Sequence, residues 1–181
     1  SDPLKREGKI ALSIDSRAQS AFESELGAAM TSFRAKGAAG VMLDVSTGEI
    51  IAMVSLPVFN PNDLRAANKD WLRSNATQSV YELGSTFKPI TMAAAIDSGV
   101  VTSMARRFDA TVPIKKGGHI IHDDRGHEQK RWLNIPETLI YSSNISTARI
   151  AEEVGRDRMQ AMFRALGFGT RPDIEVRETE Q

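Results

Sequence analysis

The sequence has no cysteine among its 181 residues and no excess of charge of either sign. The lack of cysteine excludes disulfides, a thiolate nucleophile and thiolate metal ligands, but it fits reducing and oxidising compartments equally. The 23 Lys and Arg residues balance 23 Asp and Glu residues, so overall charge indicates neither a nucleic acid nor an anionic membrane surface as partner. A small, specifically placed substrate is favoured.

Long hydrophobic runs are also missing. The longest mainly apolar stretch, 40–59, is interrupted by charged and polar side chains and by Pro57, so it lacks the composition of a membrane-spanning helix. The first eight residues contain acidic side chains and a proline and do not resemble a signal peptide. A hydrophobic content of 41% can build a sizeable core, and one domain over 1–181 is expected.

Hydrophobic periodicity predicts a strand, a helix and a hairpin in the first half of the chain. Alternation over 10–14 predicts a short strand, and apolar steps of three and four over 15–36 predict an amphipathic helix. Two β-prone runs, 38–44 and 49–55, flank a polar turn that ends in glycine, which predicts a hairpin. The polar segment 57–75 should be a loop with one short helix.

The second half is predicted to be mostly helical. A helix over 85–97 has Pro89 in its first turn, where a missing N–H costs little. Short irregular strands are expected within 107–121, and a polar loop follows them. Further helices are expected at 135–141, 145–154 and 156–166.

Two polar clusters carry the side chains that could react. Ser85 and Lys88 are three residues apart at the start of a predicted helix, so they share one face and a direct hydrogen bond is possible. A lysine can take a serine proton only if its pKa falls towards neutrality, which burial and a helix N-terminus both favour. Ser142 and Asn144 could add a proton relay and a substrate-binding amide if their loop packs over the helix start.

The serine-x-x-lysine spacing is weak evidence by itself. Many surface helices contain it by chance, as a capping serine and a solvated lysine. The segments around it, however, resemble in order the transpeptidase domain of class B penicillin-binding proteins of the septum-forming type. The matching segments are the start of the domain at 10–26, its first hairpin at 43–53, the following loop at 59–62, the nucleophile motif at 81–89 and the second motif at 141–144.

This resemblance implies an α+β fold with helices packed on an antiparallel sheet. It implies that Ser85 is the acylated nucleophile, Lys88 its base, Ser142 a proton relay and Asn144 a substrate-binding residue. The implied activity is a D,D-transpeptidase that attacks the D-Ala-D-Ala bond of peptidoglycan stem peptides, and β-lactam antibiotics would trap the serine. No metal or organic cofactor is implied. A periplasmic location on a membrane anchor, and divisome proteins as partners, are implied for the full-length protein.

Two features depart from the family pattern. Leu83 stands where the family usually has proline, from which we expect little consequence. The third motif, a lysine followed by threonine or serine and then glycine, is absent, because 115–118 lacks the hydroxyl residue and precedes the second motif. Only 37 residues follow Asn144, so the chain is expected to be the N-terminal portion of the domain. An incomplete sheet would expose an edge, which predicts dimerisation or strand exchange.

The sequence is also compatible with other functions. A β-lactam-hydrolysing or β-lactam-sensing serine protein would share Ser85 and Lys88 and differ in deacylation, and a scaffold fragment would not be acylated at all. A metal site is a weaker alternative, because sequence proximity in a polar loop does not fix ligand geometry, and a solvated loop is favoured. The side chains concerned are His119, His122, His127, Asp123, Asp124 and Glu128.

Overall fold

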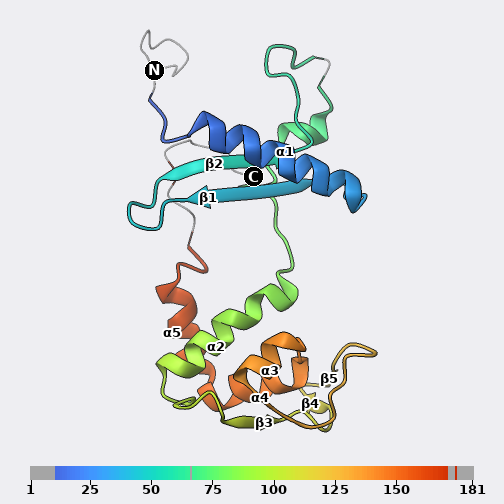
Figure 1. The fold of residues 1–181 in the computed structure, drawn as a ribbon, viewed down its shortest axis with the longest axis vertical. Helices are drawn as coiled ribbons and strands as arrows, with labels where there is room; N and C mark the ends of the chain where they lie inside the picture. The colour runs from blue at the N-terminus through green and yellow to red at the C-terminus, as the bar shows by residue number, and fades with distance from the viewer. Residues whose placement is uncertain (1–10, 66, 171–173, 175–181) are drawn as a thin grey trace. The chain divides into compact units, whose positions relative to one another are not determined.

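A computed structural model describes residues 11–65, 67–170 and 174 of the chain (Figure 1). The chain divides into two units, Ser1–Tyr81 and Glu82–Gln181, and each unit has its own strands and helices. Within the described ranges the strands pair antiparallel in two-stranded sheets. The predicted α+β class is therefore confirmed.

The first unit begins with the predicted amphipathic helix. Helix α1 (Ser16–Ser32) follows Asp15, whose carboxylate accepts hydrogen bonds from the backbone N–H groups of Arg17 (2.9 Å) and Ala18 (3.0 Å). These bonds satisfy N–H groups of the first turn that have no partner within the helix. They also lower the pKa of Asp15.

The predicted hairpin and loop helix are confirmed. Strands β1 (Ala38–Leu43) and β2 (Ile50–Leu56) pair in antiparallel register. A short 3₁₀ helix, η2 (Lys69–Leu72), lies in the segment predicted to be a loop with one short helix.

The strand predicted for 10–14 is wrong over residues 11–14, which form no strand, and residue 10 lies outside the described residues. The segment runs past the edge of β2, where the Asp15 N–H donates to Ile51 O at 3.0 Å. Because α1 begins at the next residue, Ser16, this segment is too short to form a regular ladder of hydrogen bonds with β2.

The two edges of the hairpin differ. The side-chain amide of Gln19 donates to Met53 O and accepts from Met53 N–H, both at 2.9 Å, which is the pairing that a neighbouring strand would make along β2. In the described part of the chain β1 pairs with β2 alone, and its residues Val41, Met42 and Leu43 are exposed. Among the residues that the structure describes, the outer edge of β1 therefore has no partner strand, which leaves its N–H and C=O groups open to pairing.

Helix α1 packs closely onto the hairpin at Gly40. A Cβ atom at this position would lie 2.3 Å from Cζ of Phe22 and 3.1 Å from Cδ1 of Leu26, both on α1. Val54, opposite Gly40 in the register, is buried. The missing side chain lets the helix approach the sheet.

The second unit contains the remaining elements, most of them at predicted positions. They are η3 (Gly84–Phe87), α2 (Lys88–Asp97), β3 (Arg107–Asp109), β4 (Ile114–Lys116), β5 (His119–Ile121), β6 (Trp132–Asn134), α3 (Ile135–Ile140), α4 (Asn144–Val154) and α5 (Arg156–Ala165). Strand β6, which pairs with β3, has no counterpart in the prediction. Three residues are too few to show an alternating pattern.

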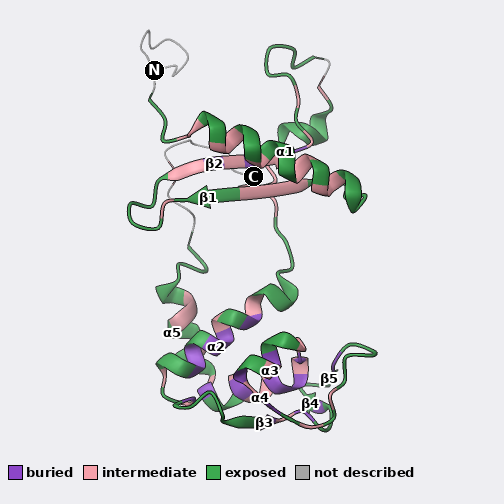
Figure 2. Cartoon of the chain, viewed as in Figure 1, coloured by how far each residue is buried: buried purple, intermediate pink, exposed green. Residues whose placement is uncertain are grey.

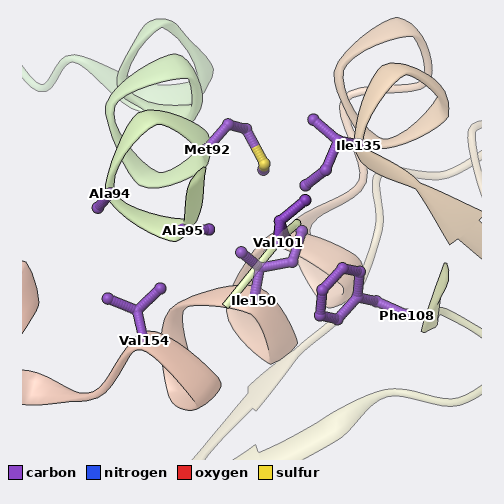
Figure 3. Packing of buried hydrophobic residues seen from close by; sticks show 8 residues of the cluster. All are labelled: Met92, Ala94, Ala95, Val101, Phe108, Ile135, Ile150 and Val154. Atoms are coloured by element: carbon purple, nitrogen blue, oxygen red, sulfur yellow. The ribbon is translucent and has the colours of Figure 1, made fainter. Parts of the chain in front are cut away.

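The core of the second unit joins α2 to α4. Figure 3 shows the cluster, which draws its buried side chains mainly from α2, β3, α3 and α4: Met92, Ala94, Ala95, Val101, Phe108, Ile135, Ile150 and Val154. In Figure 2 the buried segments of this unit lie largely on these helices. Lys88 is the first residue of α2 and Asn144 the first of α4. The packing of the two helices therefore determines how the two predicted motifs meet.

None of the helices in the described residues combines the length and the apolar composition that a membrane crossing requires. Most of the stretch 40–59 forms the two strands of the hairpin and their turn.

We expect Gly40→Ala to lower the free energy of unfolding by about 1–3 kcal/mol, because the added methyl group must displace Phe22. Gly27→Ala is the matched control. Gly27 lies in α1 with nothing within 4 Å of a Cβ at that position, so alanine should raise stability by about 0.5–1 kcal/mol through helix propensity. Urea denaturation of the full chain measures both. Equal effects of the two substitutions would contradict the close approach at Gly40.

Candidate active site

The segment predicted to hold the nucleophile, Gly84–Phe87, forms a 3₁₀ turn. The α-helix begins only at Lys88, so the prediction that Ser85 starts an α-helix is wrong in this detail. Pro89 explains the difference, because it has no N–H to donate to Ser85 O, and the Lys88 N–H takes that acceptor with 3₁₀ spacing. Side chains three residues apart eclipse in such a turn, so Ser85 and Lys88 still share one face.

Two neighbours of Ser85 shape this turn. Gly84 has a φ of 55°, in the left-handed region that residues with a side chain rarely adopt, and the exposed Ser85 follows it. The ring of Phe87 lies 5.2 Å from that of Phe163 and 5.4 Å from that of Phe168, measured between centroids. This aromatic cluster anchors the turn to α5 and to the segment after it.

Lys88 is buried, with 8% of its surface exposed. Its Nζ donates to Ser142 Oγ at 2.9 Å and also to Ser142 O. Burial lowers the pKa of Lys88, because a desolvated ammonium is unfavourable, and the negative charges of Asp123 and Asp124 oppose this effect without cancelling it. The amine is thus shifted in the direction that a base requires.

Ser142 occupies a helix end that normally takes glycine. The N–H of Ser142 donates to Leu139 O (3.1 Å) and the N–H of Ser143 donates to Thr138 O (3.0 Å), which are the two bonds of a Schellman motif at the end of α3. Ser142 has the left-handed conformation of this motif, with a φ of 52°. Serine at this position costs about 1 kcal/mol relative to glycine. It places a hydroxyl at the corner between α3 and α4.

Ser142 bridges Lys88 and Ser85. Its Oγ accepts from Lys88 Nζ and donates to Ser85 Oγ at 3.0 Å. The hydrogen bonds of the described residues include none directly between Ser85 Oγ and Lys88 Nζ, so a bridge replaces the direct contact considered from the sequence. The second cluster does pack over the start of α2, which was the condition for a joint site.

Asn144 is half-buried at the start of α4. Its Nδ2 donates to His122 O at 3.0 Å, which ties its amide to the segment after β5. Its neighbour Ser143 is fully buried and caps α4, because Ser143 Oγ accepts from the Ser146 N–H at 3.1 Å. The structure therefore gathers Ser85, Lys88, Ser142 and Asn144 within one unit of the chain.

Asp123 is a residue whose place near this site the sequence did not indicate. The expectation of a solvated loop is wrong for Asp123, which is only 3% exposed. Its carboxylate accepts from Ser143 Oγ (3.0 and 3.1 Å) and from the Ile145 N–H (3.0 Å). No signal in the sequence distinguishes it from the exposed Asp124 beside it. Within the described ranges, no group of three or more His, Asp or Glu side chains is arranged to hold a metal ion.

The geometry agrees with the comparison to known families. The family described as "Penicillin binding protein transpeptidase domain" matches residues 38–181. The chain belongs to this family.

Named relatives and solved structures point the same way. The chain is 42% identical to the probable peptidoglycan D,D-transpeptidase FtsI of Caulobacter vibrioides, over 98% of this chain and 31% of the relative. Among solved structures, a peptidoglycan glycosyltransferase from Burkholderia ambifaria has a TM-score of 0.76 and 29% identity, over 92% of this chain and 48% of that one. The TP domain of Burkholderia pseudomallei penicillin-binding protein 3 has a TM-score of 0.74 and 28% identity, over 92% and 45%. The chain thus spans about a third of the curated relative.

The strained position of Ser142 gives a stability prediction. Ser142→Gly and Ser142→Ala both remove the hydroxyl, but only glycine relieves the left-handed conformation. We expect the glycine variant to be more stable than the alanine variant by about 1 kcal/mol. Thermal and urea unfolding of the two variants measure the difference. An alanine variant as stable as the glycine variant would mean that the backbone at 142 is not left-handed.

Proposed function

We propose that the chain forms the serine-acylating part of a peptidoglycan D,D-transpeptidase of the septum-forming type. The observation that carries this proposal is the bridge from Lys88 Nζ through Ser142 Oγ to Ser85 Oγ. Membership of the transpeptidase family and the name of the Caulobacter relative support the same activity.

The proposed proton path runs along this bridge. In the structure Lys88 donates to Ser142, and Ser142 donates to Ser85. When Lys88 is neutral the direction reverses, so that Ser85 donates to Ser142 and Ser142 donates to the amine. The burial that lowers the pKa of Lys88 favours this neutral form.

The proposed acyl transfer has two steps. Ser85 Oγ attacks the carbonyl carbon of the D-Ala-D-Ala bond while its proton passes to Lys88, and a tetrahedral oxyanion forms. The C–N bond then breaks, the leaving D-alanine amine takes the proton back, and an acyl-serine ester remains. In the second step an amine of a neighbouring peptidoglycan strand attacks the ester carbon, the ester C–O bond breaks as the new amide forms, and the proton lost by the amine returns to Ser85 Oγ through Lys88. A β-lactam would follow the first step only, because its broken amide stays attached and blocks the second attack.

Asn144 is proposed to bind the substrate. Its Nδ2 is committed to His122 O, which fixes the plane of the side-chain amide and leaves Oδ1 as the group available to a substrate N–H. The location proposed for the full-length protein is the periplasmic face of the inner membrane, because its proposed substrate is the cell wall. Divisome proteins are proposed partners for the same reason.

We expect labelled penicillin to add one drug mass to the full-length gene product and none to its Ser85→Ala variant. Ser98→Ala, at the other end of α2, is the control and should be acylated like the unmodified protein. Lys88→Gln should lower the acylation rate by roughly 10²–10⁴-fold, the usual contribution of a general base. Intact-mass measurement over time follows all four proteins. An adduct that persists in Ser85→Ala would remove this serine from its proposed role.

The lifetime of the adduct separates the alternatives. A long-lived adduct fits a transpeptidase or a sensor, whereas rapid turnover of the drug would indicate a hydrolase. A scaffold protein would form no adduct in any of the variants.

We also propose that the isolated 181-residue chain associates through the open edge of β1. Val41 on this strand is exposed, and a lysine there should discourage edge pairing. Size-exclusion chromatography with light scattering should show dimers whose fraction grows with concentration, and Val41→Lys should shift the chain to monomers. Val45→Lys, in the hairpin turn outside β1, is the control and should not. A monodisperse monomer at every concentration would contradict this proposal.

A further inference from the structure

The segment after β5 accepts hydrogen bonds from three consecutive residues at the start of α4, which are 143–145. Asp123 accepts hydrogen bonds from Ser143 Oγ and from the Ile145 N–H, and His122 O accepts from Asn144 Nδ2. We call His122 and Asp123, with these bonds, the loop clamp. Ser142, which bridges the reacting pair, is the residue immediately before the clamped stretch.

We propose that Asp123 is a positioning residue for acylation, which holds Ser142 and Asn144 against Lys88 and Ser85 through the loop clamp. The inference rests on the proposed function of that site. Ser142 needs this support because a serine in the left-handed conformation is not held there by its own backbone preference. The bonds from Asp123 to the next residues restrict the corner from its α4 side.

The burial of Asp123 is the second argument. A buried carboxylate is costly unless hydrogen bonds and nearby positive charge compensate it. In the described part of the chain no salt bridge includes Asp123, and its side-chain hydrogen bonds all come from the first turn of α4 and its cap. The N-terminal end of α4 donates to this carboxylate, and the charge of Asp123 also acts on the amine of Lys88. Because the Asp123 carboxylate is shielded from water, its negative charge is weakly screened and acts on Lys88.

Asp124 provides a matched comparison. Asp123 and Asp124 are the two carboxylates whose charge raises the pKa of Lys88, against the larger effect of burial. Asp124 is exposed. Among the described residues its hydrogen bond is made by the backbone carbonyl, which accepts from the His127 N–H at 2.9 Å. A charge change at 124 therefore reproduces the electrostatic effect without touching the loop clamp.

The test is the pH dependence of acylation by labelled penicillin in the full-length gene product. Asp123→Ala removes the acceptor, and we expect the maximal acylation rate to fall by about 100-fold, the loss that a small misplacement of reacting groups produces. Asp123→Asn keeps an acceptor oxygen for Ile145 and removes the charge. The maximal acylation rate of this variant should fall less than that of Asp123→Ala. The acidic limb of its pH–rate profile should move to lower pH, because Lys88 loses its proton more readily without the negative charge. Asp124→Asn should move the acidic limb in the same direction with an unchanged maximal rate.

Three outcomes would overturn the inference. One is a maximal rate for a folded Asp123→Ala within twofold of the unmodified protein. Another is an equal loss of maximal rate in Asp124→Asn, which would make charge alone responsible. If Asp123→Ala does not fold, Asp123→Asn decides, and a pH profile that coincides with that of the unmodified protein rejects a role in the site.

A second readout separates this inference from the proposed function. Acetylation of Lys88 by acetic anhydride, followed by mass spectrometry, needs no penicillin. Loss of the loop clamp should free Ser142 and expose the amine, so Lys88 should be acetylated faster in Asp123→Ala than in Asp124→Asn. If the unmodified protein forms no penicillin adduct but this difference appears, the proposed function fails and the loop clamp stands. Equal acetylation in the two variants rejects the clamp.

Discussion

A lysine amine held out of water against a single serine is the interaction on which this site depends. Lys88 Nζ donates to both the hydroxyl and the backbone carbonyl of Ser142, and little of its surface is exposed. Exposed lysine would stay charged and could take no proton, whereas desolvation shifts it towards the neutral amine. Lys88 is the first residue of α2, and the hydrophobic core of the second unit joins α2 to α4, so the packing that builds this core also brings the amine to Ser142.

The two serines of the proposed site, Ser85 and Ser142, lie at corners of the chain and not inside α-helices. Ser85 follows Gly84 in a 3₁₀ turn, and Ser142 is the left-handed residue of the turn between α3 and α4. At the first corner glycine adopts the unusual conformation and serine follows it. At the second corner Ser142 itself adopts the left-handed conformation, which lowers local stability and fixes the position of its hydroxyl. The burial of the Asp123 carboxylate beside this corner is a second feature that is unfavourable by itself.

Much of this site could be predicted from the sequence, because Ser85, Lys88, Ser142 and Asn144 lie in short motifs with fixed spacing. The bridge through Ser142 could not be predicted, since it depends on how α4 packs against α2. Asp123 could not be distinguished from Asp124, because both lie in a polar run and only the path of the loop buries one of them. Strand β6 is too short for its alternation to be visible in the sequence. Pro89 in a first helical turn is compatible with an α-helix and with a 3₁₀ helix before it, so the sequence does not distinguish the two.

The protonation of Lys88 is the most direct test of the central claim. A ¹⁵N NMR titration of the lysine amines in the full-length gene product, with Lys88→Arg used to assign the signal, measures it without any substrate. The account predicts that Lys88 titrates clearly below the ordinary lysine value of about 10.4 and below the exposed lysines of the same chain. A Lys88 signal that titrates together with those exposed lysines would contradict the account, because the amine would then remain charged and unable to act as a base.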